Sequence, residues 1–157
     1  MKADNNHEIQ FEKNNFNIAI AASRYNFQIT EKLVNGALDF LKIYNQNTKE
    51  TEIFWVSGAF ELPLLCKNIF QIKKPDGIIA IGAVIKGDTP HFEYISNQCA
   101  RGIMSISLEV SKPISFGVLT TENYQQAIDR TGEKTANKGY EAAMSLWESL
   151  SLFKNNL

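Results

Sequence analysis

The sequence is poor in the residues that build covalent or metal-bound frameworks. Its 157 residues contain only two cysteines and two histidines. The cysteines, Cys66 and Cys99, stand alone, without CxxC spacing and without a histidine partner, so neither a disulfide framework nor a zinc site has support. Each lies in an apolar segment of helical type, and we expect both thiols in the core.

Excess charge and long hydrophobic runs are also missing. The 16 basic and 17 acidic side chains leave a net charge of −1, so the whole molecule has no field that attracts nucleic acid or an anionic membrane. The longest apolar run, Gly77 to Ile85, is too short to span a bilayer, and the start from Met1 to Asn6 is too polar for a signal peptide. We therefore expect a cytoplasmic protein without nucleic-acid or membrane partners.

The apolar segments that are present alternate between strand and helix patterns. The length and a hydrophobic fraction of 44% indicate a single domain over residues 1–157, with 1–15 as an N-terminal extension or docking strand. We expect strands at 17–22, 52–56, 77–82 and 114–120, a further short strand at 9–12, helices at about 27–44, 60–72, 91–110 and 136–153, and a short helix capped by Thr121 to Asn123.

Each expected core strand is apolar on both faces, which is typical of a parallel sheet covered by helices on both sides. The alternation predicts a three-layer αβα sandwich with a flavodoxin-like parallel sheet of about four strands. Ligands of such sheets bind at the carboxyl ends of the strands. That rule selects the segments 23–26, 57–61, 82–91 and 120–123.

The segment from Gly82 to His91 has the most unusual composition, because a strand passes into a loop of glycine and small polar residues that ends at a helix start. Backbone N–H groups around Gly87 to Thr89, with the Thr89 hydroxyl, would form an anion nest there. His91 follows directly, and imidazole is the side chain best matched to proton transfer near neutral pH. Since a single histidine is often structural, the residues alone leave both roles equally open.

Five other side chains are ambiguous by the same reasoning. Glu61 could face a ligand or only favour the start of its helix. Arg130 and Lys138 bracket a loop, and could bind a phosphate or remain solvated surface charges. Tyr25 and Phe116 are expected in the core, although either ring could stack on a flat heterocycle.

The helix expected at 91–110 carries apolar residues over about half of its circumference at 100° per residue. This arc is wider than one face of a sheet needs, so we expect a neighbouring subunit to cover part of it. Its members are Phe92, Ile95, Cys99, Ala100, Ile103, Met104, Ile106, Leu108 and Val110.

Five segments, in the same order and spacing, resemble those of the lumazine synthase family. They read Ser23-Arg24-Tyr25-Asn26, Gly58-Ala59-Phe60-Glu61-Leu62-Pro63, Gly82 to Phe92, Phe116 to Asn123, and Arg130-Thr131-Gly132-Glu133-Lys134 with Asn137-Lys138-Gly139. The resemblance extends from about residue 17 to 150. It implies condensation of 5-amino-6-(D-ribitylamino)uracil with 3,4-dihydroxy-2-butanone 4-phosphate to 6,7-dimethyl-8-ribityllumazine, the penultimate step of riboflavin biosynthesis, without a metal or organic cofactor.

The resemblance also implies residue roles and assembly. Tyr25 and Phe116 would contact the pyrimidine, Ala59, Phe60 and Glu61 the ribityl chain, and the backbone of Ala83, Val84 and Ile85 the pyrimidine edge. Asp88, Thr89, Arg130 and Lys138 would bind the butanone phosphate, and His91 would donate the proton. The family forms homo-oligomers, with active sites shared between neighbours in a pentamer. Family members that assemble no further than the pentamer have an insertion in this region, and the segment 130–138 lacks it. The resemblance therefore implies a capsid of twelve pentamers, with riboflavin synthase as a candidate partner.

Two other classes of function stay open on the sequence. A carrier that binds a lumazine or flavin without turnover would not need His91 and Arg130, which are both present. A purely structural shell would need only the assembly surfaces.

Overall fold

The computed structural model describes residues 9–47 and 49–157. Strands and helices alternate along the chain. The elements are β1 (Ile18–Ser23), α1 (Phe27–Tyr44), β2 (Glu52–Val56), η1 (Ala59–Glu61), α2 (Leu62–Ile72), β3 (Gly77–Ile85), α3 (His91–Val110), β4 (Ile114–Thr121), α4 (Tyr124–Ile128), η2 (Lys134–Ala136) and α5 (Lys138–Asn156), where η marks a single 3₁₀ turn.

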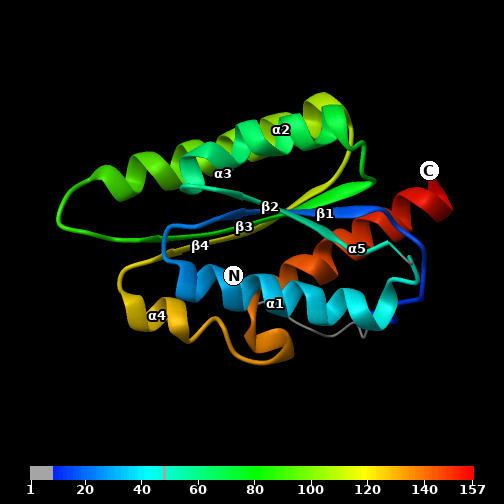
Figure 1. The fold of residues 1–157 in the computed structure, drawn as a ribbon, viewed down its shortest axis with the longest axis horizontal. Coiled ribbons are helices and arrows are strands. Elements are labelled where there is room, and N and C mark those ends of the chain that lie inside the picture. The colour runs from blue at the N-terminus through cyan, green and yellow to red at the C-terminus, as the bar shows by residue number, and fades with distance from the viewer. Residues whose placement is uncertain (1–8, 48) are drawn as a thin grey trace.

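The four strands form one parallel sheet in the order β2-β1-β3-β4. Helices α2 and α3 cover one face, and α1, α4 and α5 cover the other (Figure 1). The predicted three-layer αβα sandwich with flavodoxin-like strand order is confirmed.

The central strand β3 shows why the sequence folds in this way. Residues Gly77 to Val84 are all buried, and successive side chains point to opposite faces of the sheet. Ile79 and Ile81 pack in the core under α1 and α5, whereas Ile78 and Ala80 pack under α2 and α3. A strand that is apolar on both faces can therefore pack against the helices on both sides of the sheet.

β3 is longer than the sequence predicted. It continues through Ile85, because Ala83 stays paired with Leu119 and Ile85 with Thr121 on β4. Pairing with β1 ends earlier, at Ile81. The last residues of β3 therefore pair with β4 alone, and the connecting loop shrinks to residues 86–90.

The strand expected at 9–12 does not form within the described chain. Phe11 instead packs against the rings of Phe40 and Tyr44 on α1, at centroid distances of 5.3 and 5.4 Å. The backbone of Asn14 forms an isolated parallel bridge with Asn45. Packing of the Phe11 ring on α1 thus holds the segment 9–12 in place, although the short apolar pattern of this segment is typical of a strand. The role of residues 1–15 as an N-terminal extension or docking strand stays a prediction.

Both cysteines lie in the core between α2 and α3, as predicted. Burial raises the pKa of each thiol from 9.0 to about 12, and the neighbouring Cys99 adds to the increase at Cys66. The thiols remain protonated and unreactive near neutral pH, so they serve packing.

Part of the apolar arc on α3 is left uncovered by the chain itself. Met104 and Leu108 have exposed fractions of 62% and 71%, whereas Ile103 and Ile106 on the inner side are buried. The arc is therefore wider than the sheet requires, as the sequence indicated. None of the helices within residues 9–47 and 49–157 is long and apolar enough to cross a membrane.

A candidate active site in two parts

Most of the predicted site residues line one cavity of about 570 Å³, which we call the β3 pocket. It lies where β1, β2 and β3 end and η1 and α3 begin, which is the end of a parallel sheet that binds ligands. Its lining residues are Tyr25, Ser57, Gly58, Ala59, Phe60, Glu61, Ala83, Val84, Ile85, Gly87, Thr89, His91, Phe92 and Ile95.

The exposed edge of β3 supplies backbone groups to this pocket. The Asn26 amide nitrogen donates to the Ala83 carbonyl oxygen at 2.9 Å, on the side that β1 has vacated. Lys86 N–H points the other way and donates to Thr121 on β4. Because backbone groups alternate along a parallel strand, the N–H and C=O of Ile85 point to the vacated side with those of Ala83. This arrangement presents a donor and an acceptor side by side to a ligand.

Glu61 supports the start of its helix, and it is also placed where a ligand could meet it. One of its carboxylate oxygens accepts from the backbone N–H of Gly58 at 2.9 Å, which supports the turn η1 before α2. The same side chain lines the β3 pocket. The second carboxylate oxygen can accept from a ligand hydroxyl group without loss of the turn.

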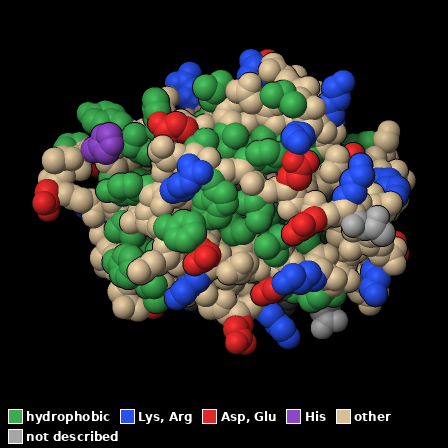
Figure 2. All heavy atoms as spheres, in the orientation of Figure 1, with side chains coloured by type: hydrophobic (Ala, Val, Ile, Leu, Met, Phe, Trp, Pro, Cys, Tyr) green, Lys and Arg blue, Asp and Glu red, His purple; other side chains and the backbone are tan. Residues whose placement is uncertain are grey.

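His91 is the first residue of α3 and is exposed at the rim of the β3 pocket. The histidine side chain, purple in Figure 2, lies at the surface beside hydrophobic side chains. Gly87 and Thr89 of the preceding loop also line the pocket, as the anion-nest hypothesis requires, but Asp88 does not. His91 is thus held at the start of a helix, where a molecule bound in the pocket could reach its side chain.

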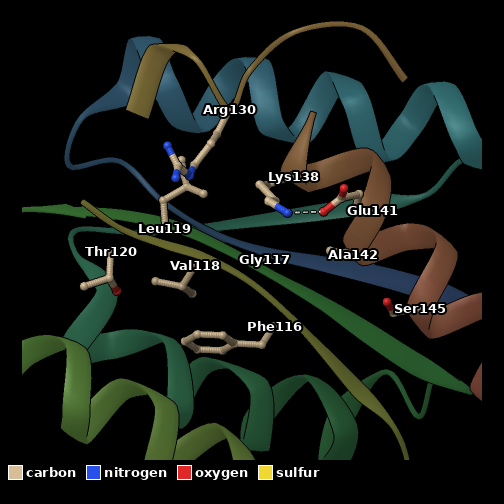
Figure 3. Close-up of a pocket in the computed structure, with 10 residues that line it drawn as sticks. All are labelled: Phe116, Gly117, Val118, Leu119, Thr120, Arg130, Lys138, Glu141, Ala142 and Ser145. Carbon is tan, nitrogen blue, oxygen red and sulfur yellow. Dashed lines mark hydrogen bonds and ion pairs between the residues drawn. The ribbon is translucent and has the colours of Figure 1, made fainter. Parts of the chain in front are cut away.

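Three more of the predicted residues, Phe116, Arg130 and Lys138, line a second cavity of about 280 Å³. We call it the β4 pocket, because it lies along β4, which pairs only with β3 in the described chain. Arg130 and Lys138 project toward β4 from the side of α4 and α5, and the Phe116 ring lies on the opposite side, toward α3 (Figure 3). The full lining is Phe116, Gly117, Val118, Leu119, Thr120, Arg130, Lys138, Glu141, Ala142 and Ser145.

The β4 pocket has one excess positive charge. Arg130 donates from Nη1 to the carbonyl oxygen of Gln126 at 2.7 Å, which fixes the guanidinium group while its other N–H groups remain available. Lys138 is paired with Glu141 in the same helix turn (Figure 3). Two cations against one carboxylate favour an anionic ligand.

Glu141 is a charged lining residue that the sequence did not predict. Its spacing of three residues from Lys138 on a helix is the signal that could have identified the ion pair. Tyr25 and Phe116 were expected in the core, and that prediction is wrong, since their exposed fractions are 73% and 47%. Both rings therefore have a surface on which a flat ligand could stack.

The two pockets have no lining residue in common, and the paired ends of β3 and β4 lie between them. Residues predicted to bind one phosphate are consequently divided, with Thr89 in the β3 pocket and Arg130 and Lys138 in the β4 pocket. In the described part of the chain, no three metal-ligating side chains lie together.

Residues 15–154 match a family model described as 6,7-dimethyl-8-ribityllumazine synthase.

Proposed function

The chain belongs to the 6,7-dimethyl-8-ribityllumazine synthase family, and we propose that it condenses 5-amino-6-(D-ribitylamino)uracil with 3,4-dihydroxy-2-butanone 4-phosphate. The products are 6,7-dimethyl-8-ribityllumazine, phosphate and water. Membership of this family implies lumazine synthase activity in riboflavin biosynthesis. The identity of the two substrates is the part that we propose. The observation that supports it best is the presence of two pockets of different chemistry, one aromatic and polar and the other cationic.

The β3 pocket is the proposed site of the pyrimidine. Tyr25 would stack on the ring, and the backbone edge of Ala83 to Ile85, where Asn26 already occupies the Ala83 carbonyl oxygen, would pair with the polar edge of the heterocycle. The segment from Ala59 to Glu61 would hold the ribityl hydroxyl groups. Each role uses a residue that lines the β3 pocket.

The β4 pocket is the proposed site of the phosphate of the second substrate. Arg130 can offer a forked pair of N–H donors, and Lys138 a mobile point charge. Asp88 and Thr89 would complete the phosphate site from the β3 side, although Asp88 lines neither pocket in the single chain. The division of these ligands between two pockets supports an active site formed by two copies, in which the β4 pocket of one, with Phe116, faces the β3 pocket of the next.

Assembly into a closed ring would supply that arrangement, because a head-to-tail contact repeated by rotation joins the same two surfaces each time. The exposed apolar side of α3 is a surface that such a contact can cover. We propose a pentamer, and twelve pentamers in a hollow capsid. Light scattering of the purified protein distinguishes five chains from sixty.

The proposed chemistry needs proton transfer and alignment more than an activated nucleophile. The 5-amino group of the pyrimidine attacks the ketone carbonyl, and one water leaves as the imine forms. Phosphate is eliminated, and the ribitylamino nitrogen then attacks the remaining carbonyl group, so that the second ring closes with loss of a second water. Holding the two reactants together removes most of the entropic barrier. His91, at the rim of the β3 pocket, would move protons between nitrogen, oxygen and water through these steps.

The two unpaired thiols fit a reducing compartment, and we propose the cytoplasm.

The direct test is to mix the purified protein with both substrates and follow the fluorescence of the lumazine product. We expect formation much faster than the uncatalysed reaction. Tight binding of a flavin or lumazine together with an uncatalysed rate would show a carrier instead of an enzyme.

Replacing Arg130 with alanine is expected to impair use of the phosphorylated ketone selectively. Loss of charge-assisted hydrogen bonds of roughly 1.5–2 kcal/mol would raise KM for this substrate about 10- to 30-fold, with KM for the pyrimidine unchanged. Arg130→Lys should give an intermediate value, because it retains the charge without the fork. Lys42→Ala, which removes a surface cation paired with Asp39 on α1, is the control. Equal increases in both KM values would contradict the assignment.

A further inference from the structure

The two cations of the β4 pocket stand at the two ends of one loop. Arg130 follows α4, and Lys138 is the first residue of α5. The backbone N–H of Lys138 donates to the carbonyl oxygen of Arg130 at 2.9 Å, and Thr131 and Asn137 form an antiparallel bridge beside this bond. These contacts hold the two ends of the loop together, and we call the paired ends, residues 130–131 and 137–138, the neck. The contacts that fix the neck also fix the positions of both cations.

The side chain of Asn137 holds this neck. It is 4% exposed and lines neither pocket. Its Oδ1 accepts from the N–H groups of Gly139 at 2.8 Å and Tyr140 at 3.3 Å, which caps α5. Its Nδ2 donates to the carbonyl oxygen of Lys32 in the middle of α1 at 3.0 Å. Asn137 thus joins the neck of the loop to a second helix with one planar amide.

Asparagine suits this place for two reasons. Serine, threonine and aspartate also cap helices, but among the common capping side chains only asparagine combines the acceptor with an amide donor. The fit is also tight, since a Cβ atom added at Gly36 would lie 2.2 Å from Asn137 Oδ1. The amide is pressed against the backbone of α1, so the neck has little freedom to shift.

We propose that Asn137 is a positioning residue that fixes Arg130 and Lys138 for the anionic substrate without touching it. This inference rests on the proposed function, which assigns the phosphate to the β4 pocket. The long helix α1, whose inner face packs in the core, acts as the support, and Asn137 fixes the loop to it. A displaced neck would move both cations together, so both would lose their alignment with one phosphate.

The decisive variant is Asn137→Asp. It retains the oxygen that caps α5, but it replaces the donor with an oxygen that faces the Lys32 carbonyl group. We expect KM for the phosphorylated ketone to rise on the order of 10-fold, while KM for the pyrimidine stays unchanged. Asn137→Ser, which removes the same donor and adds no charge, should show the same selectivity and replaces the aspartate variant if that does not fold.

The matched control is Asn45→Ala. The Asn45 amide also joins two backbone segments, because it accepts from Phe16 N–H at 3.2 Å and donates to the Phe16 carbonyl oxygen at 3.0 Å. It lies at the C-terminal end of α1, away from both pockets. A loss of stability alone should therefore appear in the control as well, without any change in either KM.

Calorimetric titration with inorganic phosphate separates this inference from the proposed reaction. The unaltered protein should bind phosphate, and both Asn137 variants should bind it on the order of 10-fold more weakly. If the unaltered protein forms no lumazine, the proposed reaction fails, and phosphate binding still decides the role of Asn137. Unchanged phosphate affinity in the variants, equal changes in both KM values, or no phosphate binding by the unaltered protein would overturn the inference.

Discussion

His91→Ala is expected to lower kcat by on the order of 100-fold while affinity for the pyrimidine stays near its original value. A positioned proton donor contributes about that factor or more, and the reaction retains the benefit of bringing its substrates together. His91 lines the β3 pocket, but the groups proposed to bind the pyrimidine are the Tyr25 ring and the backbone of Ala83 to Ile85. The loss should therefore fall on turnover.

The measurement is steady-state kinetics with both substrates, together with a fluorescence titration of the pyrimidine alone. His91→Asn, which can donate a hydrogen bond but does not titrate, should remain as slow as the alanine variant. Loss of pyrimidine binding in either variant would assign His91 a structural role, and an unchanged kcat would remove it from the mechanism.

Gly139→Ala is expected to have the largest effect on folding. A Cβ atom at this position would lie 1.8 Å from the carbonyl oxygen and 2.5 Å from the carbonyl carbon of Leu33. Both are backbone atoms of α1, so no side-chain rotation relieves the collision, and α5 must move away from α1. Because Trp147 and Leu146 of α5 are buried in the core, we expect a loss of more than about 4 kcal/mol, or an insoluble protein.

Urea unfolding and the soluble yield check this expectation. Gly87→Ala is the matched control for stability, because a Cβ atom there meets nothing within 4 Å and should change the free energy of unfolding by less than about 1 kcal/mol. A Gly139→Ala protein within that same range would show that the helices are packed less closely than described.

The fold was predictable because its signals are local. Strands apolar on both faces and helices with one apolar face determine the layers, and turn residues such as Pro75 and Asp76 separate them. The length of β3 was not predictable, because its last three residues are held by pairing with β4, and each of them pairs with a residue 36 positions further along the chain (Ala83 with Leu119, for example). Likewise, the short apolar pattern at 9–12 could not show that Phe11 would pack on α1.

The sequence predicted that most candidate residues would lie at one edge of the sheet, but not that they would be divided between two pockets. The carboxyl-end rule placed Glu61 and His91 at one edge of the sheet, and the structure brings them to one pocket. The residues themselves gave no sign that Arg130 would lie across β4 from His91, because that depends on how β4 ends the sheet. Asn137 lies in a segment that carries the family resemblance but had no predicted role, because a buried cap and a surface asparagine have the same sequence pattern.

The central claim is that one active site uses His91 of one copy and Arg130 of another. Co-expression of His91→Ala with Arg130→Ala, at equal amounts and assayed at low ketone concentration, tests it directly. Random mixing around a ring joins an intact β3 pocket to an intact β4 pocket at about one site in four. The account therefore predicts activity near one quarter of that of the unaltered protein, whereas activity no greater than the mean of the two separate variants would contradict it.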